Sequence, residues 1–565
     1  MYILGINSVY HESAVCLIKD GEIIFAIEEE RINRRKHGKA ANLNNPDQLP
    51  LASIETALSF TGISLSDIDC IGYSIDPVAR HKSAYIDEIK LQDDWATGPG
   101  EALFYRQTAN VPLKLHEMGF RGDFHWVSHH TAHAASAYYP SPFNESLILS
   151  LDGIGEDNTA GVFMGKNHQL SKISTVDYPH SIGFMWEKFA EYLGFSEYDA
   201  CKVMGMAAYG DARTFRKQFD KIAKCLPEGQ FTINNEILAF RDKTFSKLEI
   251  LLALPHRHKN DELRQAHFDI AATLQAVTDD IVMNMAQHYL ALTGSRHICL
   301  AGGVALNCIT NRLLYEKCAI TDIYVQPAAH DAGTAIGAAL YIWHQILNNQ
   351  ERHPMVNAYL GPEYSDTQYE EELKRYGLQW EKPDNIHETV ASLIAQNNVV
   401  AWFQGRMEFG PRALGNRSLL ADPRNREIRD LMNLKVKHRE FFRPFAPSVL
   451  REHVNDWFVS RGLPGASQYM LLAMEVKQEK QDVIPAVTHA DGTARVQVVD
   501  DETNARYSRL LSAFHHLTGV PILLNTSFND SEPVVCSPED AIKTFLKTRI
   551  DYLVLGNYIT KSCHQ

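Results

Sequence analysis

The sequence contains no apolar stretch that reaches the roughly 18 residues a membrane-spanning helix needs. Residues 1–7 do not show the basic-then-apolar pattern of a secretory signal peptide. Both absences argue against an integral membrane protein or a secreted one. We therefore expect a cytoplasmic protein with no membrane partner.

Closely spaced cysteine pairs are also missing. The nine cysteines are scattered, odd in number and never arranged as CxxC. Disulfide frameworks and many zinc sites depend on such regular pairs. Reduced thiols are therefore expected, in keeping with a cytoplasmic location.

Two nucleotide-binding signatures are absent, the P-loop and the GxGxxG fingerprint. An ordinary kinase, P-loop ATPase or dehydrogenase is therefore disfavoured. The chain also lacks an excess of basic residues, since 69 acidic residues outnumber 55 lysines and arginines and the net charge is −14. Electrostatic binding of nucleic acid is accordingly not expected.

The organisation of the chain indicates two domains. Its 565 residues exceed what one hydrophobic core accommodates. Residues 3–24 and 148–170 both follow a strand–turn–strand pattern, which predicts two similar α/β lobes closing on a ligand. Residues 348–360 have little pattern and read as a linker. We predict an α/β domain over 1–350 and a second α/β domain over 351–565.

The most informative segment is Val127–Ala137, together with the turn that begins at Asp152. His129 and His133 are four residues apart, which on a helix places both imidazoles on one face. Small residues around them let another backbone approach closely. Asp152 and Asp331 lie in polar turns beside glycine. These four residues suit Fe(II), Mn(II) or Zn(II), with a purely structural histidine pair as the alternative.

Two further segments near the amino terminus could serve a ligand. His11 lies in the polar turn after the first predicted strand and is a candidate general base or phosphate ligand. The basic run 31–39 follows the third predicted strand, where Lys36 or His37 could reach an anion. The alternative for both segments is an ordinary solvated surface.

A glycine pair lies in Ala301–Asn307, directly after a short predicted strand. A strand that enters two glycines and then a helix brings backbone amides toward a ligand. Gly302, Gly303 and Asn307 are therefore the predicted nucleotide-binding residues.

The second domain contains arginines separated by glycine and proline, in the stretches 405–424 and 435–447. Such arginines lie in shaped turns, where their planar guanidinium groups grip phosphate or carboxylate oxygens. In an acidic protein this predicts a pocket for a small anion, to which 525–529 adds hydroxyl and amide groups. A structural arginine network is the alternative.

These motifs resemble the O-carbamoyltransferases of the NodU/CmcH type. The resemblance runs in order over nearly the whole chain. It is carried by His129–His133, Leu151–Glu156, Lys202–Gly210, Ala301–Asn307, Gly405–Ser418, Arg443–Pro447 and Leu524–Asn529. One departure is visible, since the family commonly has His-Asp-x-Ser-Ala where this chain has His11-Glu-Ser-Ala14.

The resemblance implies an actin-like, TsaD-like first domain and a YrdC-like second domain. In such enzymes the second domain converts carbamoyl phosphate and Mg²⁺-ATP into carbamoyl-adenylate, and the first transfers the carbamoyl group to a hydroxyl. Carried over by motif, the iron ligands are His129, His133, Asp152 and Asp331. Transfer-site residues are His11 and Lys36. The adenylation pocket comprises Arg412, Arg417, Lys437, Arg443, Asn525 and Ser527.

The resemblance implies a small natural product or sugar as acceptor, and exposed Arg- and Phe-rich stretches allow a homodimer. Two other functions compete with this one. A tRNA threonylcarbamoylation-type enzyme is disfavoured by the acidic charge. A non-catalytic actin-like ATP-binding module leaves the arginine-rich second domain unexplained.

Overall fold

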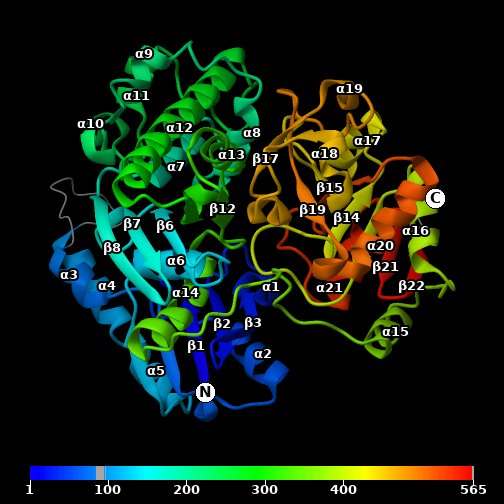
Figure 1. Cartoon of the computed structure of the whole chain (residues 1–565), viewed down its shortest axis with the longest axis horizontal. Helices are drawn as coiled ribbons and strands as arrows, with labels where there is room; N and C mark the ends of the chain where they lie inside the picture. The colour runs from blue at the N-terminus through cyan, green and yellow to red at the C-terminus, as the bar shows by residue number, and fades with distance from the viewer. Residues whose placement is uncertain (84–94, 96, 563–565) are drawn as a thin grey trace. The chain divides into compact units, whose positions relative to one another are not determined.

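The computed structural model describes residues 1–83, 95 and 97–562. By their contacts these residues form two compact units (Figure 1). The first unit comprises Met1–Glu29 and His37–Met355, and the second comprises Glu30–Lys36 and Val356–Gln565. No helix within the described residues is long and apolar enough to cross a membrane.

The first unit contains two five-stranded sheets of the same topology. In order across the first sheet, its strands are β3 (Glu22–Glu28), β2 (Ala14–Lys19), β1 (Tyr2–Asn7), β4 (Cys70–Tyr73) and β5 (Asp123–Trp126). In the second sheet they are β8 (Gln169–Asp177), β7 (Asn158–Lys166), β6 (Glu145–Leu151), β11 (His297–Ala301) and β12 (Asp322–Val325).

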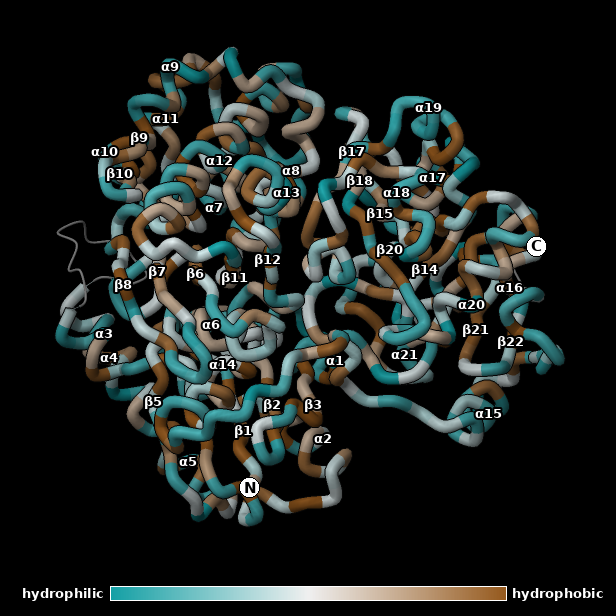
Figure 2. The backbone as a smooth tube through the Cα atoms, in the orientation of Figure 1, coloured by the Kyte–Doolittle hydropathy of each residue, from teal (hydrophilic) through white to brown (hydrophobic). Residues whose placement is uncertain are grey.

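Each sheet begins with three antiparallel strands and ends with two strands added in parallel. The predicted repetition of the strand–turn–strand unit is therefore confirmed. Two lobes of one α/β topology are the architecture predicted for an actin-like domain. The core consists of apolar side chains on these strands, such as the fully buried Ile3, Leu4 and Ile6 of β1. Figure 2 shows hydrophobic segments, in brown, along the backbone of the labelled strands.

Helices and a small hairpin complete the first unit. The hairpin pairs β9 (Ala223–Cys225) with β10 (Phe231–Ile233). The helices are α2 (Leu51–Thr61), α3 (Pro77–Ser83), α4 (Gly98–Thr108), α5 (Val111–Glu117), α6 (His129–Tyr138), α7 (Ile182–Tyr192), α8 (Ala200–Ala207), α9 (Arg216–Phe219), α10 (Asn235–Leu238), α11 (Ser246–Leu252), α12 (Gln265–Thr293), α13 (Cys308–Lys317) and α14 (Thr334–Tyr341).

Helix α14 packs closely against both α6 and β1 because small residues meet there. A Cβ atom at Gly337 of α14 would lie 1.7 Å from the carbonyl oxygen of Ala132 on α6. A Cβ at Gly5 of β1 would lie 1.8 Å from the carbonyl oxygen of Ala335. The close backbone approach predicted from the small residues of α6 is thus confirmed, and it sets the position of the two histidines.

The second unit is built on a mixed seven-stranded sheet. In order, its strands are β19 (Gln497–Val499), β15 (Ala446–Leu450), β20 (Ile522–Ser527), β14 (Arg417–Ala421), β13 (Val400–Phe403), β21 (Tyr552–Leu555) and β22 (Tyr558–Lys561). A smaller sheet joins β16 (Phe458–Val459), β17 (Ala473–Val476) and β18 (Thr493–Arg495). The α/β class predicted for this part of the chain is confirmed.

Helices of the second unit are mostly short. They are α15 (Asp366–Arg375), α16 (Ile386–Ala395), α17 (Arg426–Leu431), α18 (Val454–Trp457), α19 (Gln478–Gln481), α20 (Asp501–Thr518) and α21 (Pro538–Lys547). Helix α1 (Glu29–Asn33) follows β3 directly, yet from Glu30 onward its residues have their contacts in the second unit.

Candidate functional site

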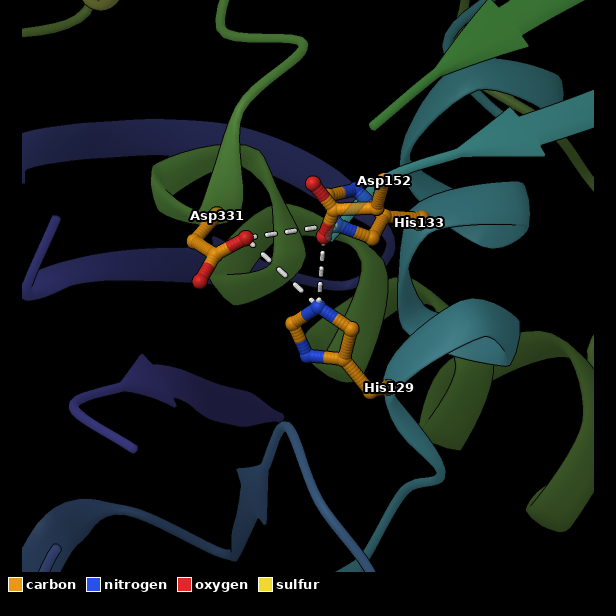
Figure 3. Close-up of side chains that lie close together, drawn as sticks. All are labelled: His129, His133, Asp152 and Asp331. Carbon is orange, nitrogen blue, oxygen red and sulfur yellow. Dashed lines mark hydrogen bonds and ion pairs between the residues drawn. The ribbon is translucent and has the colours of Figure 1, made fainter. Parts of the chain in front are cut away.

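Two histidines and two aspartates converge in the first unit (Figure 3). Helix α6 presents His129 and His133 one turn apart, Asp152 follows β6, and Asp331 begins the short turn that precedes α14. Their four candidate ligand atoms all lie within 4.8 Å of one another. The four residues that the sequence predicts as metal ligands therefore lie together in the fold.

The side-chain nitrogen and oxygen atoms of this cluster lie close enough together to contact one ion. The Nε2 atom of His129 lies 3.1 Å from Asp152 Oδ2 and 3.5 Å from Asp331 Oδ1. The Nε2 atom of His133 lies 3.2 Å and 3.5 Å from the same two oxygens. Two imidazole nitrogens and two carboxylate oxygens form a donor set that binds divalent transition metals.

Surrounding groups orient these ligands. The second oxygen of Asp152 accepts a hydrogen bond from the backbone N–H of Gly303. The Nδ1 atom of His129 faces the carbonyl oxygen of Ser74 at 3.3 Å, which favours the tautomer that leaves Nε2 free for a metal. Both histidines are fully buried. The residues present therefore fit a divalent ion.

The electrostatics of the cluster also favour a bound cation. Burial by itself would lower the pKa of His129, but Asp331 and Asp152 together raise it well above its ordinary value. Burial would raise the pKa of Asp152, yet hydrogen bonds from both histidines hold it well below the usual range. The two carboxylates thus require positive charge beside them, which protons or a metal ion can supply.

The adjacent His130 has a different role. Its Nδ1 lies 2.7 Å from Ser150 Oγ and its Nε2 lies 3.0 Å from the carbonyl oxygen of Asn158. Burial lowers its pKa to about 3, so the ring is neutral. Both ring nitrogens already have partners, which makes His130 a structural residue beside the cluster of two histidines and two aspartates.

A metal-binding test follows from this geometry. Adding Zn²⁺, Co²⁺ or Fe²⁺ should raise the thermal unfolding temperature, because an ion bound only by the folded state contributes about 2.7 kcal/mol at 100 times its Kd. Asp331→Asn should abolish most of the shift, and Asp220→Asn, from an exposed ion pair with Arg216, should not. The shift should shrink as pH falls, since protons compete for the imidazoles and His129 has a raised pKa. An unchanged unfolding temperature with all three ions would contradict a metal site.

His11 lies among aromatic rings in the first unit. Its ring stands edge-on to Tyr198 at a centroid distance of 5.4 Å, and Tyr198 stacks on His37 at 4.3 Å. The Nδ1 atom of His11 is buried and has no hydrogen-bond partner in the described structure. Tyr198 carried no signal in the sequence, because only the fold brings it to these histidines.

Glu12, which departs from the family pattern in the turn after β1, pairs with His37. Its backbone is in the left-handed region with φ of 54°, and its carboxylate lies 2.5 Å from His37 Nδ1. Burial opposes ionisation of Glu12, but His330 and His37 lower its pKa overall. Lys36, in contrast, is exposed on a segment of the second unit and has no polar partner among the described side chains.

The glycine pair after β11 contacts the residues that carry the histidine and aspartate cluster. Gly302 has φ of +89°, and a Cβ there would lie 2.1 Å from the carbonyl oxygen of Leu151, so this position requires glycine. Gly303 donates to Asp152, and the Asn307 side chain caps α13 by accepting from the N–H groups of Ile309 and Thr310. Nucleotide binding by Gly302, Gly303 and Asn307 stays a prediction.

In the second unit, Lys437 is the centre of a polar cluster. Its Nζ donates to Asn529 Oδ1 at 2.7 Å, to the Asn529 carbonyl at 2.8 Å and to Ser527 Oγ at 3.2 Å. Burial lowers its pKa well below the ordinary value, and the nearby charges of Arg439 and Arg443 act in the same direction. Asn529 belongs to the motif 525–529 that the sequence indicates for anion binding, but it is not among the six pocket residues that the resemblance implies.

The predicted arginines of this pocket differ in their surroundings. Arg417 is fully buried, and its guanidinium donates to the carbonyl oxygens of Gln404, Gly405, Asn416 and Pro362. Arg443 is only partly buried, and its side chain makes no hydrogen bond or ion pair with the described residues. Arg443 is therefore the more available anion ligand, whereas Arg417 already binds the backbone.

Asn525 and Arg412 are the remaining predicted pocket residues. The Nδ2 group of Asn525 donates to Gln497 Oε1 at 2.9 Å and to Ser448 Oγ at 3.1 Å. Its Oδ1 atom is buried and accepts no hydrogen bond from any described group. Arg412 is partly buried in the loop before β14. The structure thus places all six predicted residues in one unit, with ligand binding still a prediction.

Two family models together match most of this chain. A family model described as carbamoyltransferase N-terminus matches residues 2–340, and one described as carbamoyltransferase C-terminus matches residues 391–562. Nodulation protein NolNO of Sinorhizobium fredii is 39% identical over 98% of this chain and 79% of its own length. An uncharacterized protein of Synechocystis sp. is 38% identical over 99% and 96%.

Solved structures offer more distant matches. Full-length HypF, in a phosphate- and nucleotide-bound form, is 12% identical, covers 62% of this chain and 56% of its own, and has a TM-score of 0.34. The family assignment rests instead on the two models and on the relatives of high coverage, which confirm the resemblance drawn from the motifs. The chain belongs to the carbamoyltransferase family and is a carbamoyl-transferring enzyme.

Proposed function

We propose that this enzyme is an ATP-dependent O-carbamoyltransferase that works in two half-reactions. In the second unit, carbamoyl phosphate is hydrolysed to carbamate and phosphate, and carbamate then displaces pyrophosphate from ATP to give carbamoyl-adenylate. In the first unit, an acceptor hydroxyl attacks the carbamoyl carbon and AMP leaves. We propose 1–350 and 351–565 as the domains that carry these two roles.

The observation that carries this proposal is the separation of two kinds of chemistry within one chain. The histidine and aspartate cluster belongs to the first unit, and the lysine and arginine cluster belongs to the second. Cationic side chains and backbone amides suit the phosphates of ATP and carbamoyl phosphate. A buried carboxylate-rich site suits a metal-assisted group transfer instead.

Residues of the first unit would perform the transfer as follows. His129, His133, Asp152 and Asp331 would hold the divalent ion, which when bound supplies Lewis-acid stabilisation of charge that develops on oxygen. His11, with an unpartnered buried ring nitrogen, would accept the proton of the attacking hydroxyl. Gly302, Gly303 and Asn307 would border the nucleotide. Lys36, whose contacts are in the second unit, is a further candidate transfer residue on the basis of its motif.

Residues of the second unit would bind the anions. Arg443 and Arg412 would contact phosphate oxygens with their guanidinium groups. Lys437, Ser527 and Asn525 would position the carbamoyl group and the phosphate, with Arg417 holding the surrounding backbone. Mg²⁺ would accompany ATP. The acceptor would be a small hydroxylated natural product or sugar.

A direct assay tests the proposal. Incubation of the enzyme with ATP, carbamoyl phosphate and Mg²⁺ should release pyrophosphate and yield carbamoyl-adenylate detectable by mass spectrometry. A screen of hydroxylated sugars and natural products should then find an acceptor that gains one carbamoyl group while AMP is formed. Absence of both pyrophosphate and the adenylate would refute the first half-reaction.

A further inference from the structure

Residues Glu30–Lys36 belong by contacts to the second unit although the chain continues directly into them from β3. Arg31 is only 4% exposed, and its Nη2 donates to the carbonyl oxygen of Gly410 at 2.9 Å. Gly410 lies in the loop 404–416 between β13 and β14, two residues before Arg412. One arginine of this segment therefore holds the loop that leads into the predicted pocket.

Arg34 holds a second loop of the same unit. Its Nη1 donates to the carbonyl oxygen of Val534 at 2.7 Å, and its Nη2 donates to that of Pro533 at 2.6 Å. The guanidinium also lies 3.6 Å from Asp540 at the start of α21. These bonds fix the chain that follows β20, which carries no regular secondary structure between Phe528 and Ser537.

The second loop is connected to the lysine cluster by further hydrogen bonds. Asn529 Nδ2 donates to the carbonyl oxygen of Glu532, immediately before the residues that Arg34 holds. Asn529 Oδ1 in turn accepts from Lys437 Nζ and from Ser527 Oγ at 2.7 Å each. A continuous chain of bonds thus runs from Arg34 through the loop to Lys437.

We propose that Arg31 and Arg34 are positioning residues of the adenylate-forming pocket, supplied to it by the amino-terminal part of the chain. The inference rests on the proposed function, because it specifies what holds that pocket in shape. Loops without regular structure keep their geometry only where their backbone groups find fixed partners. Charged guanidinium groups are strong and directional partners for carbonyl oxygens.

The loops of the second unit therefore depend on residues 31 and 34, which precede the predicted linker 348–360 by more than 300 positions in the chain. Displacement of a substrate-positioning loop by about 1 Å can lower a rate on the order of 100-fold. Loss of Arg34 would release the carbonyl groups of 533 and 534, and with them Asn529 and the orientation of Lys437. Loss of Arg31 would free the carbonyl oxygen of Gly410. The loop could then shift and move Arg412 away from its position in the pocket.

The test uses the full-length enzyme and compares Arg31→Ala, Arg34→Ala and Arg34→Lys with Arg35→Ala. Arg35 is exposed, lies in the same segment and uses no side-chain bond to any described residue, so it is a matched control. We expect both Ala variants to lower kcat/KM for carbamoyl phosphate in pyrophosphate release about 10- to 100-fold. Arg34→Lys should restore part of it, and Arg35→Ala should match the wild type.

Two further readouts separate positioning from general unfolding. Zn²⁺ binding should stay at the wild-type value, and KM for carbamoyl phosphate should change more than KM for ATP. The unfolding temperature of each alanine variant should fall but stay above the assay temperature, because each variant loses hydrogen bonds to backbone carbonyl oxygens. Unchanged pyrophosphate release in both alanine variants would overturn the inference. So would a loss of activity accompanied by loss of Zn²⁺ binding or by unfolding at the assay temperature, or an equal loss of activity in Arg35→Ala. Failure of the wild type itself to release pyrophosphate would instead refute the proposed function on which the inference rests.

Discussion

Replacing His133 by Ala should abolish carbamoyl transfer while pyrophosphate release from ATP and carbamoyl phosphate continues at the wild-type rate. His133 contributes one of four converging ligand atoms, with its Nε2 3.2 Å from Asp152 Oδ2. It belongs to the first unit, whereas the lysine cluster belongs to the second. Removal of one electrostatic stabiliser of a transition state lowers kcat on the order of 10²–10³-fold, and loss of the ion would lower it further.

The measurement follows AMP and carbamoylated acceptor for transfer, and pyrophosphate for adenylation. His116→Ala is the control, because His116 is an exposed side chain on α5 of the same unit. Carbamoyl-adenylate should accumulate in the His133 variant and then hydrolyse slowly. If pyrophosphate release falls in parallel with transfer, the two half-reactions do not occupy separate sites, and the proposed division of labour is wrong.

Arg443→Ala should produce the opposite pattern, with pyrophosphate release lowered on the order of 10²-fold and metal binding unchanged. The Arg443 guanidinium has no polar partner within the described structure and adds positive charge beside Lys437. It is thus free to contact an incoming phosphate or carboxylate in two places at once. Its replacement should cost little stability, because no described bond is lost.

Arg443→Lys tests whether geometry or charge matters. Lysine keeps the charge but cannot form the paired contacts of a guanidinium, so we expect only partial recovery of pyrophosphate release. Arg426→Ala is the control, since Arg426 is largely exposed and lies 3.6 Å from Asp482. Wild-type pyrophosphate release by Arg443→Ala would remove this residue from the pocket and leave Arg412 and Lys437 as the candidate anion ligands.

Local pattern was sufficient for much of the first unit. The strand–turn–strand pattern over residues 3–24 corresponds to β1, the turn that follows it and β2. Such patterns are set by which face of each element is buried, and that information is local. For the same reason the spacing of His129 and His133 sufficed to place both rings on one face of α6.

Contacts between residues far apart in the chain could not be predicted from local sequence patterns. The sequence does not reveal that the Asn307 side chain caps α13 and contacts Gln275, and nucleotide binding by Asn307 stays a prediction. The place of segment 30–36 in the chain predicts that it belongs to the first domain, whereas its contacts are in the second unit. Backbone carbonyl oxygens are its main partners, and every residue has one, so no sequence motif marks them.

The order of residues along the chain is enough to show which chemical groups each unit can offer, with imidazole and carboxylate ligands in one and cationic groups in the other. Which of those groups can reach a ligand depends on how the chain packs. His129 and Asp331 become neighbours only when α6 and the turn before α14 pack together. The Arg417 guanidinium donates hydrogen bonds to backbone carbonyl oxygens, whereas the Arg443 guanidinium makes none with the described residues. The difference arises because folding brings backbone acceptors next to Arg417 and not next to Arg443.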